Sequence, residues 1–220
     1  MIELVNITKT YDLGASKVQA LTDINLTINK GDFLAIEGPS GSGKSTLLNI
    51  IGCIDTPTEG KVYLSGVDVS NLKDRELTKI RLRKIGFIFQ LFYLIPTLTA
   101  QENIELPMRE TRNPSRERKQ RVEKLLKMVD LIQRAHHYPN QLSGGEQQRI
   151  AIARALANKP EIILADEPTG EIDRPTSNKI LAIFKNLVKK TDIVIILVTH
   201  DPKVASKTNR RITIEDGRIV

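Results

Sequence analysis

Residues Gly38-Pro39-Ser40-Gly41-Ser42-Gly43-Lys44-Ser45 match the phosphate-binding loop pattern G-x-x-x-x-G-K-[ST]. The loop stands between an apolar run, 33–36, and an amphipathic run, 46–51, which predicts the strand, loop and helix that this motif requires. Glycines let backbone N–H groups turn toward an anion, and the start of the following helix adds its positive end. Lys44 supplies a charge for the outer phosphates, and Ser45 is suited to ligate Mg²⁺.

Length and composition are those of a soluble nucleotide-binding domain. The chain has 220 residues, 40% hydrophobic and 27% charged, enough for one good core or a core with a small subdomain. It has neither an apolar run of about 18 residues nor a basic-then-apolar start, so we expect a cytoplasmic chain without a membrane span. Cys53 is the only cysteine, and its apolar neighbours predict a buried thiol.

The net charge of +7 comes largely from the segment 109–127. Such a segment suits nucleic acid or an anionic membrane surface. The alternative is a solvated helix face, favoured by an apolar stripe in the same segment: Val122, Leu125, Leu126 and Val129.

Apolar patterns predict an α/β fold. The alternation of Ile24, Leu26 and Ile28 with polar residues indicates a strand with one solvated face, so we expect an N-terminal antiparallel sheet completed by 61–64. Three nearly continuous apolar runs, 85–89, 162–165 and 193–198, are typical of parallel strands buried on both faces.

Helical periodicity dominates between Gln90 and Pro160. Thr99 and Glu102 form a predicted capping box, and Ser115 is a predicted N-cap. We therefore predict a single domain over 1–220, in which 1–89 and 160–220 form a P-loop core and 90–159 an inserted α-helical subdomain. A later helix is predicted to begin after Asp173, with an inward face made of Ile180, Ile183, Phe184 and Leu187. Residues 212–220 are predicted to form a terminal hairpin.

Polar residues follow the buried runs, where parallel sheets bind their ligands. Asp166 and Glu167 end the run 162–165, and adjacent strand residues point to opposite faces, so the two acids need separate tasks. We assign Asp166 to Mg²⁺ and Glu167 to the attacking water. The alternative is an acidic turn without chemistry.

Two further polar residues end apolar runs. His200, after 193–198, is a candidate donor to a γ-phosphate or to the attacking water, although a lone histidine at a strand end is more often structural. Gln90, after 85–89, is a candidate metal or water ligand, or simply a polar strand end.

A second distinctive stretch is Leu142-Ser143-Gly144-Gly145-Glu146, which precedes the amphipathic run 150–156. A capping box accounts for Ser143 and Glu146 but not for two glycines, which weaken a helix. Bare N–H groups at a helix start bind anions. The chain therefore has two predicted phosphate-binding elements.

The order of P-loop, Gln90, LSGGE, Asp166-Glu167 and His200 resembles that of the ATP-binding cassette (ABC) ATPases over essentially the whole chain. The resemblance implies that Ser143 and Gly145 contact the γ-phosphate of an ATP held by a second copy, in a head-to-tail dimer with two ATP molecules between the chains. It also implies that Tyr11 stacks on adenine, the alternative being a loop aromatic without a ligand. Glu171 and Ile172 depart from the family, which more often has a small residue and Leu there.

The resemblance completes the candidate site. It implies that the cofactors are ATP and Mg²⁺, that Glu167, His200 and Gln90 are catalytic, and that Ser45, Gln90 and Asp166 ligate the metal. The expected nucleotide contacts are Tyr11, Gly38, Ser40, Gly41, Ser42, Gly43, Lys44, Ser45, Thr46, Ser143, Gly144, Gly145, Glu146 and Asp173.

Residues 51–60 and 94–99 look like the lipoprotein-releasing, macrolide-efflux and cell-division branch. This implies a peripheral subunit on the cytoplasmic membrane face that works on separate transmembrane permease subunits. By the family pattern the permease docks after Gln90, where Phe92, Tyr93, Leu94 and Leu98 are candidates unless they pack internally.

Two other functions are weaker alternatives. An ABC-type ATPase acting on nucleic acid or ribosomes usually has two cassettes or a long coiled-coil insertion, which 220 residues cannot hold. A small-molecule kinase or a GTPase would leave LSGGE unexplained, and a GTPase would also need a guanine-reading N-K-x-D motif. We therefore expect no nucleic acid partner.

Overall fold

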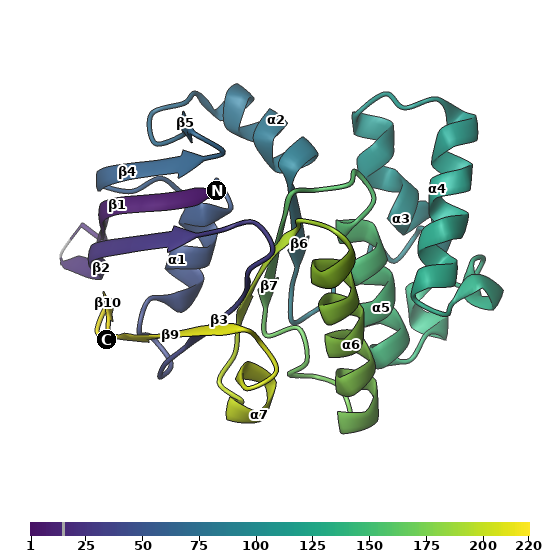
Figure 1. Cartoon of the computed structure of the whole chain (residues 1–220). Helices are drawn as coiled ribbons and strands as arrows, with labels where there is room; N and C mark the ends of the chain where they lie inside the picture. The colour runs from purple at the N-terminus through teal and green to yellow at the C-terminus, as the bar shows by residue number, and fades with distance from the viewer. Residues whose placement is uncertain (15) are drawn as a thin grey trace.

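The computed structural model describes residues 1–14 and 16–220. Within these residues the strands form two sheets (Figure 1). The smaller is antiparallel, in the order β2 (Lys17–Ile28), β1 (Ile2–Asp12), β4 (Glu59–Leu64) and β5 (Val67–Asp68). It confirms the predicted N-terminal antiparallel sheet.

The larger sheet is parallel except at one edge. Its order is β10 (Arg218–Ile219), β9 (Arg210–Glu215), β3 (Phe33–Glu37), β8 (Val194–Val198), β7 (Ile162–Asp166) and β6 (Ile85–Ile88). Only β10 is antiparallel, because it returns on β9 as the predicted hairpin. All three continuous apolar runs thus became parallel strands.

Alternate residues of these strands enter different cores, which explains the continuous runs. Ile195 and Leu197 of β8 lie in one apolar cluster, whereas Val194, Ile196 and Val198 lie in the other. Both faces are therefore covered, as a parallel sheet requires.

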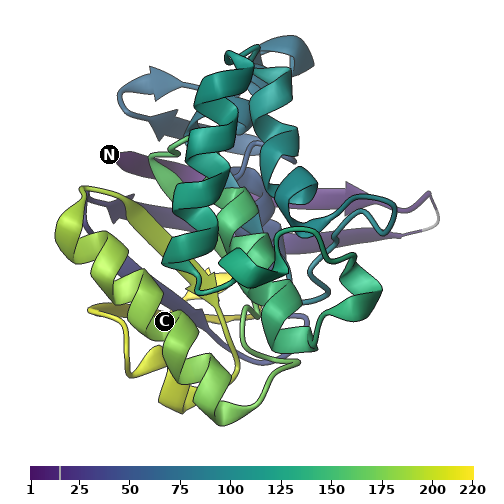
Figure 2. The ribbon, with the colours of Figure 1, turned by 90° about the vertical axis from the view of Figure 1, so that its right-hand side faces the viewer.

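Helices cover the two faces. The apolar cluster on one face contains residues of α1 (Lys44–Ile51), of the antiparallel sheet and of α2 (Asp74–Lys84). The opposite cluster holds α6 (Arg174–Lys190) and the helical block of α3 (Ala100–Glu110), α4 (Ser115–Met128) and α5 (Gly144–Ala155). Short helices η1 (Ile132–Arg134) and η2 (Pro139–Gln141) precede α5, and α7 (Pro202–Ala205) follows β8. Figure 2 shows α3, α4 and α5 gathered together.

The structure confirms the predicted helix starts with one exception. Thr99 and Ser143 each form a capping box, with Glu102 and Glu146 respectively. Ser115, predicted as an N-cap, is instead the first helical residue, because Pro114 with ψ of 142° is the last residue outside the helix. The boundaries 1–89, 90–159 and 160–220 stay a prediction, although the helical block does lie between β6 and β7. No helix in the described residues is long and apolar enough to span a bilayer.

Candidate nucleotide-binding site

The P-loop joins β3 to α1 and is shaped by close backbone contacts. Gly43, the N-cap of α1, has φ of 104°, and a Cβ there would lie 2.5 Å from the carbonyl oxygen of Ala20. A side chain would therefore force the loop away from β2. The ammonium of Lys44 donates to the carbonyls of Gly38 (3.0 Å) and Pro39 (2.6 Å), so it lies inside the turn of the loop.

Polar groups of the loop are available for a ligand. The Ser42 hydroxyl is buried and has no hydrogen-bond partner within the described chain, an arrangement that costs free energy unless a ligand completes it. Ser40 and Gly41 are exposed at the tip. The loop therefore fits an anion such as a phosphate.

The Ser45 hydroxyl donates to Asp166 at 3.2 Å, which joins the P-loop to the end of β7. No cluster of three His, Cys, Asp or Glu side chains that could hold a metal occurs in residues 1–14 and 16–220. A hydroxyl beside one carboxylate instead fits Mg²⁺, which takes its other ligands from substrate phosphates and water.

Among the described residues Asp166 forms no salt bridge. Burial raises the pKa of its carboxyl above the ordinary value, and the neighbouring charge of Glu167 raises it further, against the Ser45 hydrogen bond and the charge of Lys44. A divalent cation would favour the ionised form of this carboxylate. The electrostatics therefore suit the predicted metal role.

Glu167 and His200 form a pair. Glu167 has φ of 46°, which turns it out of the line of β7. One carboxylate oxygen accepts from the His200 backbone N–H at 3.1 Å and lies 2.7 Å from His200 Nδ1. A carboxylate only accepts, so Nδ1 carries the proton and Nε2 faces away from Glu167.

Gln90 is held by a residue that departs from the family pattern. Its Nε2 donates to Glu171 Oε1 at 2.9 Å, between positions 81 residues apart. No hydrogen bond connects Gln90 with Ser45 or Asp166 in the part of the chain that is described. The structure therefore brings Ser45 and Asp166 together but leaves Gln90 at the neighbouring loop.

Tyr11 belongs to a polar network that the sequence did not reveal. Its hydroxyl donates to Asp55 at 2.8 Å, and Lys9 donates to the other oxygen of Asp55 at 2.6 Å. Burial and the hydrogen bond with Asp55 raise the pKa of Tyr11, against a weaker opposing contribution from Thr46. Asp55 thus fixes the orientation of the aromatic ring expected to meet adenine.

The second predicted phosphate-binding element lies at the start of α5. Ser143 accepts from the Glu146 N–H, and Glu146 accepts from the Ser143 N–H, whose hydrogen bond lowers the pKa of Glu146. Packing also accounts for a glycine at position 145, since a Cβ there would lie 2.7 Å from Thr176 Cγ2. A Cβ at Gly144 would make only ordinary contacts, with Phe92 and Glu171, and Ser143 beside it is exposed.

Asp173 is the N-cap of α6 and accepts from Thr176 N–H at 3.1 Å. The same segment supplies Glu171 to Gln90, and Gln148 of α5 donates to the Pro168 carbonyl at 2.7 Å. The helix that follows LSGGE is therefore tied to the loop that follows Asp166 and Glu167. The sequence did not predict this contact of Gln148, since its spacing indicates only a helix.

The loop after Gln90 differs from the expectation. Of the four predicted docking residues only Tyr93 is well exposed (60%), whereas Phe92, Leu94 and Leu98 are partly buried, and Leu94 packs against the core. Phe92 and Tyr93 have left-handed backbones, with φ of 59° and 45°. Arg154 holds this turn by donating to both carbonyls, a role that sequence reasoning missed.

An N-K-x-D tetrad does occur, as Asn29-Lys30-Gly31-Asp32. It forms the turn between β2 and β3, in which Asp32 accepts from the Asn29 N–H and pairs with Arg210 at 3.3 Å. The tetrad precedes β3 whereas the P-loop follows it, so the two lie at opposite ends of that strand. It therefore gives no support to a GTPase.

Comparisons with known proteins agree with this geometry. The family model described as ABC transporter matches residues 21–170. The uncharacterized ABC transporter ATP-binding protein MJ0796 of Methanocaldococcus jannaschii is 53% identical, over 100% of this chain and 95% of its own. The macrolide export ATP-binding/permease protein MacB of Brucella abortus is 48% identical, over 100% of this chain but 34% of MacB.

A solved structure gives the same result. The ATP-binding cassette MJ0796, in a dimeric post-hydrolysis state bound to ADP and Pi, superposes with a TM-score of 0.93 at 52% identity, covering 100% of this chain and 96% of that one. The chain therefore belongs to the ABC transporter family. Within that family it is an ATP-binding ATPase, with ATP and Mg²⁺ as cofactors.

Proposed function

We propose that two copies of this chain bind two ATP molecules between them and that closure and hydrolysis drive a separate membrane permease. The observation that carries this proposal is the separation of the two phosphate-binding elements. In Figure 1 α1 lies on the left of the molecule, whereas α5 lies on the right with α3 and α4. Because one chain offers the elements at separate places, a second copy has to complete each site.

The roles follow the chemistry of each group. The P-loop N–H groups and Lys44 bind phosphates. When a phosphate binds, the Lys44 ammonium gives up its hydrogen bonds to the carbonyls of Gly38 and Pro39 and donates to the phosphate instead. Ser143, Gly144 and Gly145 of the second copy bind the γ-phosphate. Ser45 and Asp166 hold Mg²⁺, which neutralises charge on the phosphates when bound.

Glu167 positions or deprotonates the attacking water, and His200 keeps the carboxylate in place. Since Nδ1 donates to Glu167, the outer nitrogen of His200 can donate to a γ-phosphate only when the ring is protonated or has turned. His200 can thus contact both the Glu167 carboxylate and the γ-phosphate. Gln90 can ligate the metal only after its hydrogen bond to Glu171 breaks. Breaking this bond between accessible groups costs about 1 kcal/mol.

Permease docking belongs to a groove beside Tyr93. The groove has a volume of about 490 Å³ and is lined in part by Ile54, Phe87, Phe89, Tyr93 and Arg154. Ile54 is 49% exposed and Tyr93 60%, and exposed apolar groups of this kind mark partner surfaces. The chain would then sit at the cytoplasmic membrane face, and the likeness to MacB favours export as the direction of transport.

Replacing Ile54 and Tyr93 together by Ser is expected to abolish assembly with the permease. ATP-dependent dimerisation should stay intact, because no phosphate-binding residue is changed, and stability should fall by no more than about 1 kcal/mol. Pull-down with the permease and thermal melts measure both effects. Tyr138→Ser, at another exposed tyrosine, is the matched control. Normal assembly of the double variant, or a collapse of its melting temperature, would contradict the docking role.

Asp55→Ala is expected to weaken ATP binding about three- to tenfold, because Tyr11 loses the carboxylate that orients its ring. Affinity for inorganic tripolyphosphate should not change, since that ligand has no base to stack. Calorimetry with both ligands measures the difference, with Asp68→Ala as control for loss of a surface acid. An equal loss for ATP and tripolyphosphate would argue against an adenine platform.

A further inference from the structure

A second cavity lies at the other end of the parallel sheet. Its volume is about 900 Å³, within the range of about 300–1,000 Å³ typical of small-molecule sites. Pro160 and Glu161 before β7, and Asp192 and Ile193 before β8, line it, whereas the nucleotide site follows the ends of these strands. The cavity is therefore separate from the ATP site.

Its floor is apolar. Leu125 and Met128 of α4 and Ile183 and Leu187 of α6 line it, with Leu156 and Ile193. The α6 pair packs against the core as predicted, but both residues are only partly buried, because they also line this cavity. Met128 is 37% exposed, and its flexible thioether adapts readily to an apolar ligand.

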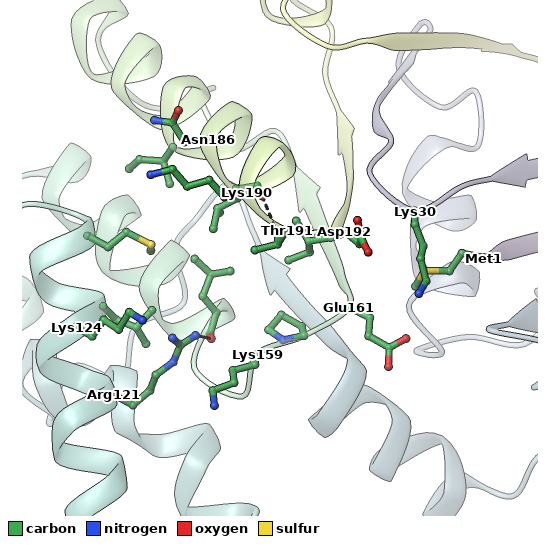
Figure 3. A pocket seen from close by; sticks show the side chains of 17 residues that line it. Met1, Lys30, Arg121, Lys124, Lys159, Glu161, Asn186, Lys190, Thr191 and Asp192 are labelled. Atoms are coloured by element: carbon green, nitrogen blue, oxygen red, sulfur yellow. Dashed lines mark hydrogen bonds between the residues drawn. The ribbon is translucent and has the colours of Figure 1, made fainter.

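Its rim is basic. Figure 3 shows Arg121, Lys124 and Lys159 on one side, Lys30 on the other, and Lys190 at the end of α6. In the described part of the chain none of these five pairs with a carboxylate. Of the two acids in the lining, Glu161 is already paired with Lys84, at 3.4 Å. The rim thus has an excess of positive charge.

Arg121 is the least solvated of these cations. It donates through Nη2 to the Leu156 carbonyl at 2.6 Å and through Nε to the Ala157 carbonyl at 3.3 Å. Burial lowers its pKa, which reflects a guanidinium removed from water without a neutralising acid. Its Nη1 makes no hydrogen bond within residues 1–14 and 16–220, which leaves it for an anion, and guanidinium groups bind carboxylates well.

We propose that this cavity binds a small anionic amphiphile, with a carboxylate head at Arg121, Lys124 and Lys190 and an unbranched alkyl tail on the apolar floor. The basic rim favours a negatively charged head group, and the apolar floor favours an alkyl tail. The volume of about 900 Å³ suits one small molecule better than a membrane surface or a protein helix. Because α4 and α6 both line the cavity, the ligand would bridge the helical block and the core. The proposal does not depend on the function proposed above.

Titration of the full chain with sodium decanoate below its micelle concentration tests the site. We expect saturable one-to-one binding by calorimetry, with NMR shifts concentrated at the Met128 and Ile183 methyl groups. Decyltrimethylammonium, which has the same tail and the opposite charge, should not compete. An acidic amphipathic peptide that binds in place of decanoate would overturn the assignment to a small molecule.

Charge reversal provides the decisive variants. Lys124→Glu with Lys190→Glu should weaken decanoate binding about tenfold or more, because two cations at the head become anions. Lys119→Glu with Lys185→Glu changes the same charge on the same two helices outside the cavity and should have no effect. Met128→Glu, at an exposed position, should also block binding. Unchanged affinity in both cavity variants, equal binding of the cationic probe, methyl shifts elsewhere, or no saturable binding would each overturn the proposal.

Discussion

Glu167→Gln is expected to lower ATP turnover by about 10²- to 10⁴-fold while leaving ATP affinity nearly unchanged. The amide keeps the size of the carboxylate but cannot accept a proton from water. It can still receive the hydrogen bond from the His200 backbone through its carbonyl oxygen, so the local fold should persist. Phosphate release and equilibrium ATP binding, measured on the same preparation, give the two quantities.

Glu215→Gln is the matched control, because it makes the same change at an exposed residue of β9. It should hydrolyse ATP at the wild-type rate. If Glu167→Gln hydrolysed ATP within a few-fold of wild type, the proton acceptor or water-positioning group would have to be another residue. If it lost ATP affinity as well, Glu167 would be a binding residue.

The second large effect is expected from separating the two phosphate-binding elements. Lys44→Ala should weaken ATP binding to the single chain, because it removes the ammonium held within the P-loop turn. Ser143→Arg should leave that binding intact and abolish turnover, because a long cation would block the start of α5 in the closed dimer. Loss of the N-cap adds about 1 kcal/mol of destabilisation, which a melting curve can measure.

Mixing the two inactive variants tests whether Ser143 acts across the dimer. A mixed dimer contains one site with an intact Lys44 and an intact partner Ser143, so part of the turnover should return. Ser143→Arg is preferable to a substitution of Gly145, since a side chain there would also collide with Thr176. Gln120→Arg, which adds the same side chain on α4, should behave as wild type. Strong loss of ATP affinity in Ser143→Arg alone would instead mean that Ser143 serves its own chain.

The sequence predicted those parts of the fold that depend on short-range patterns. The run 194–198 could be identified as a doubly covered strand because every residue is apolar, and its alternate residues do enter the two cores. The capping boxes at Thr99 and Ser143 are likewise local, since each residue reaches a partner three positions away.

Side-chain pairs between distant segments could not be predicted. Asp55 meets Tyr11 across 44 residues, Glu171 meets Gln90 across 81, and Arg154 reaches the carbonyl of Phe92 across 62. No periodicity or spacing rule indicates such partners, because the packing of the whole sheet brings them together. For the same reason the sequence left open whether Leu94 contacts a permease or packs internally, and only the packed structure shows that it turns inward.

Binding of ATP between two copies of this chain is tested most directly by the mass of Glu167→Gln in solution. Light scattering should give a monomer without nucleotide and a dimer with ATP, because ATP that cannot be hydrolysed keeps both phosphate-binding elements joined. Adding Ser143→Arg to the same chain should return the ATP-bound protein to a monomer. A monomer of Glu167→Gln with measured full ATP occupancy would contradict the account.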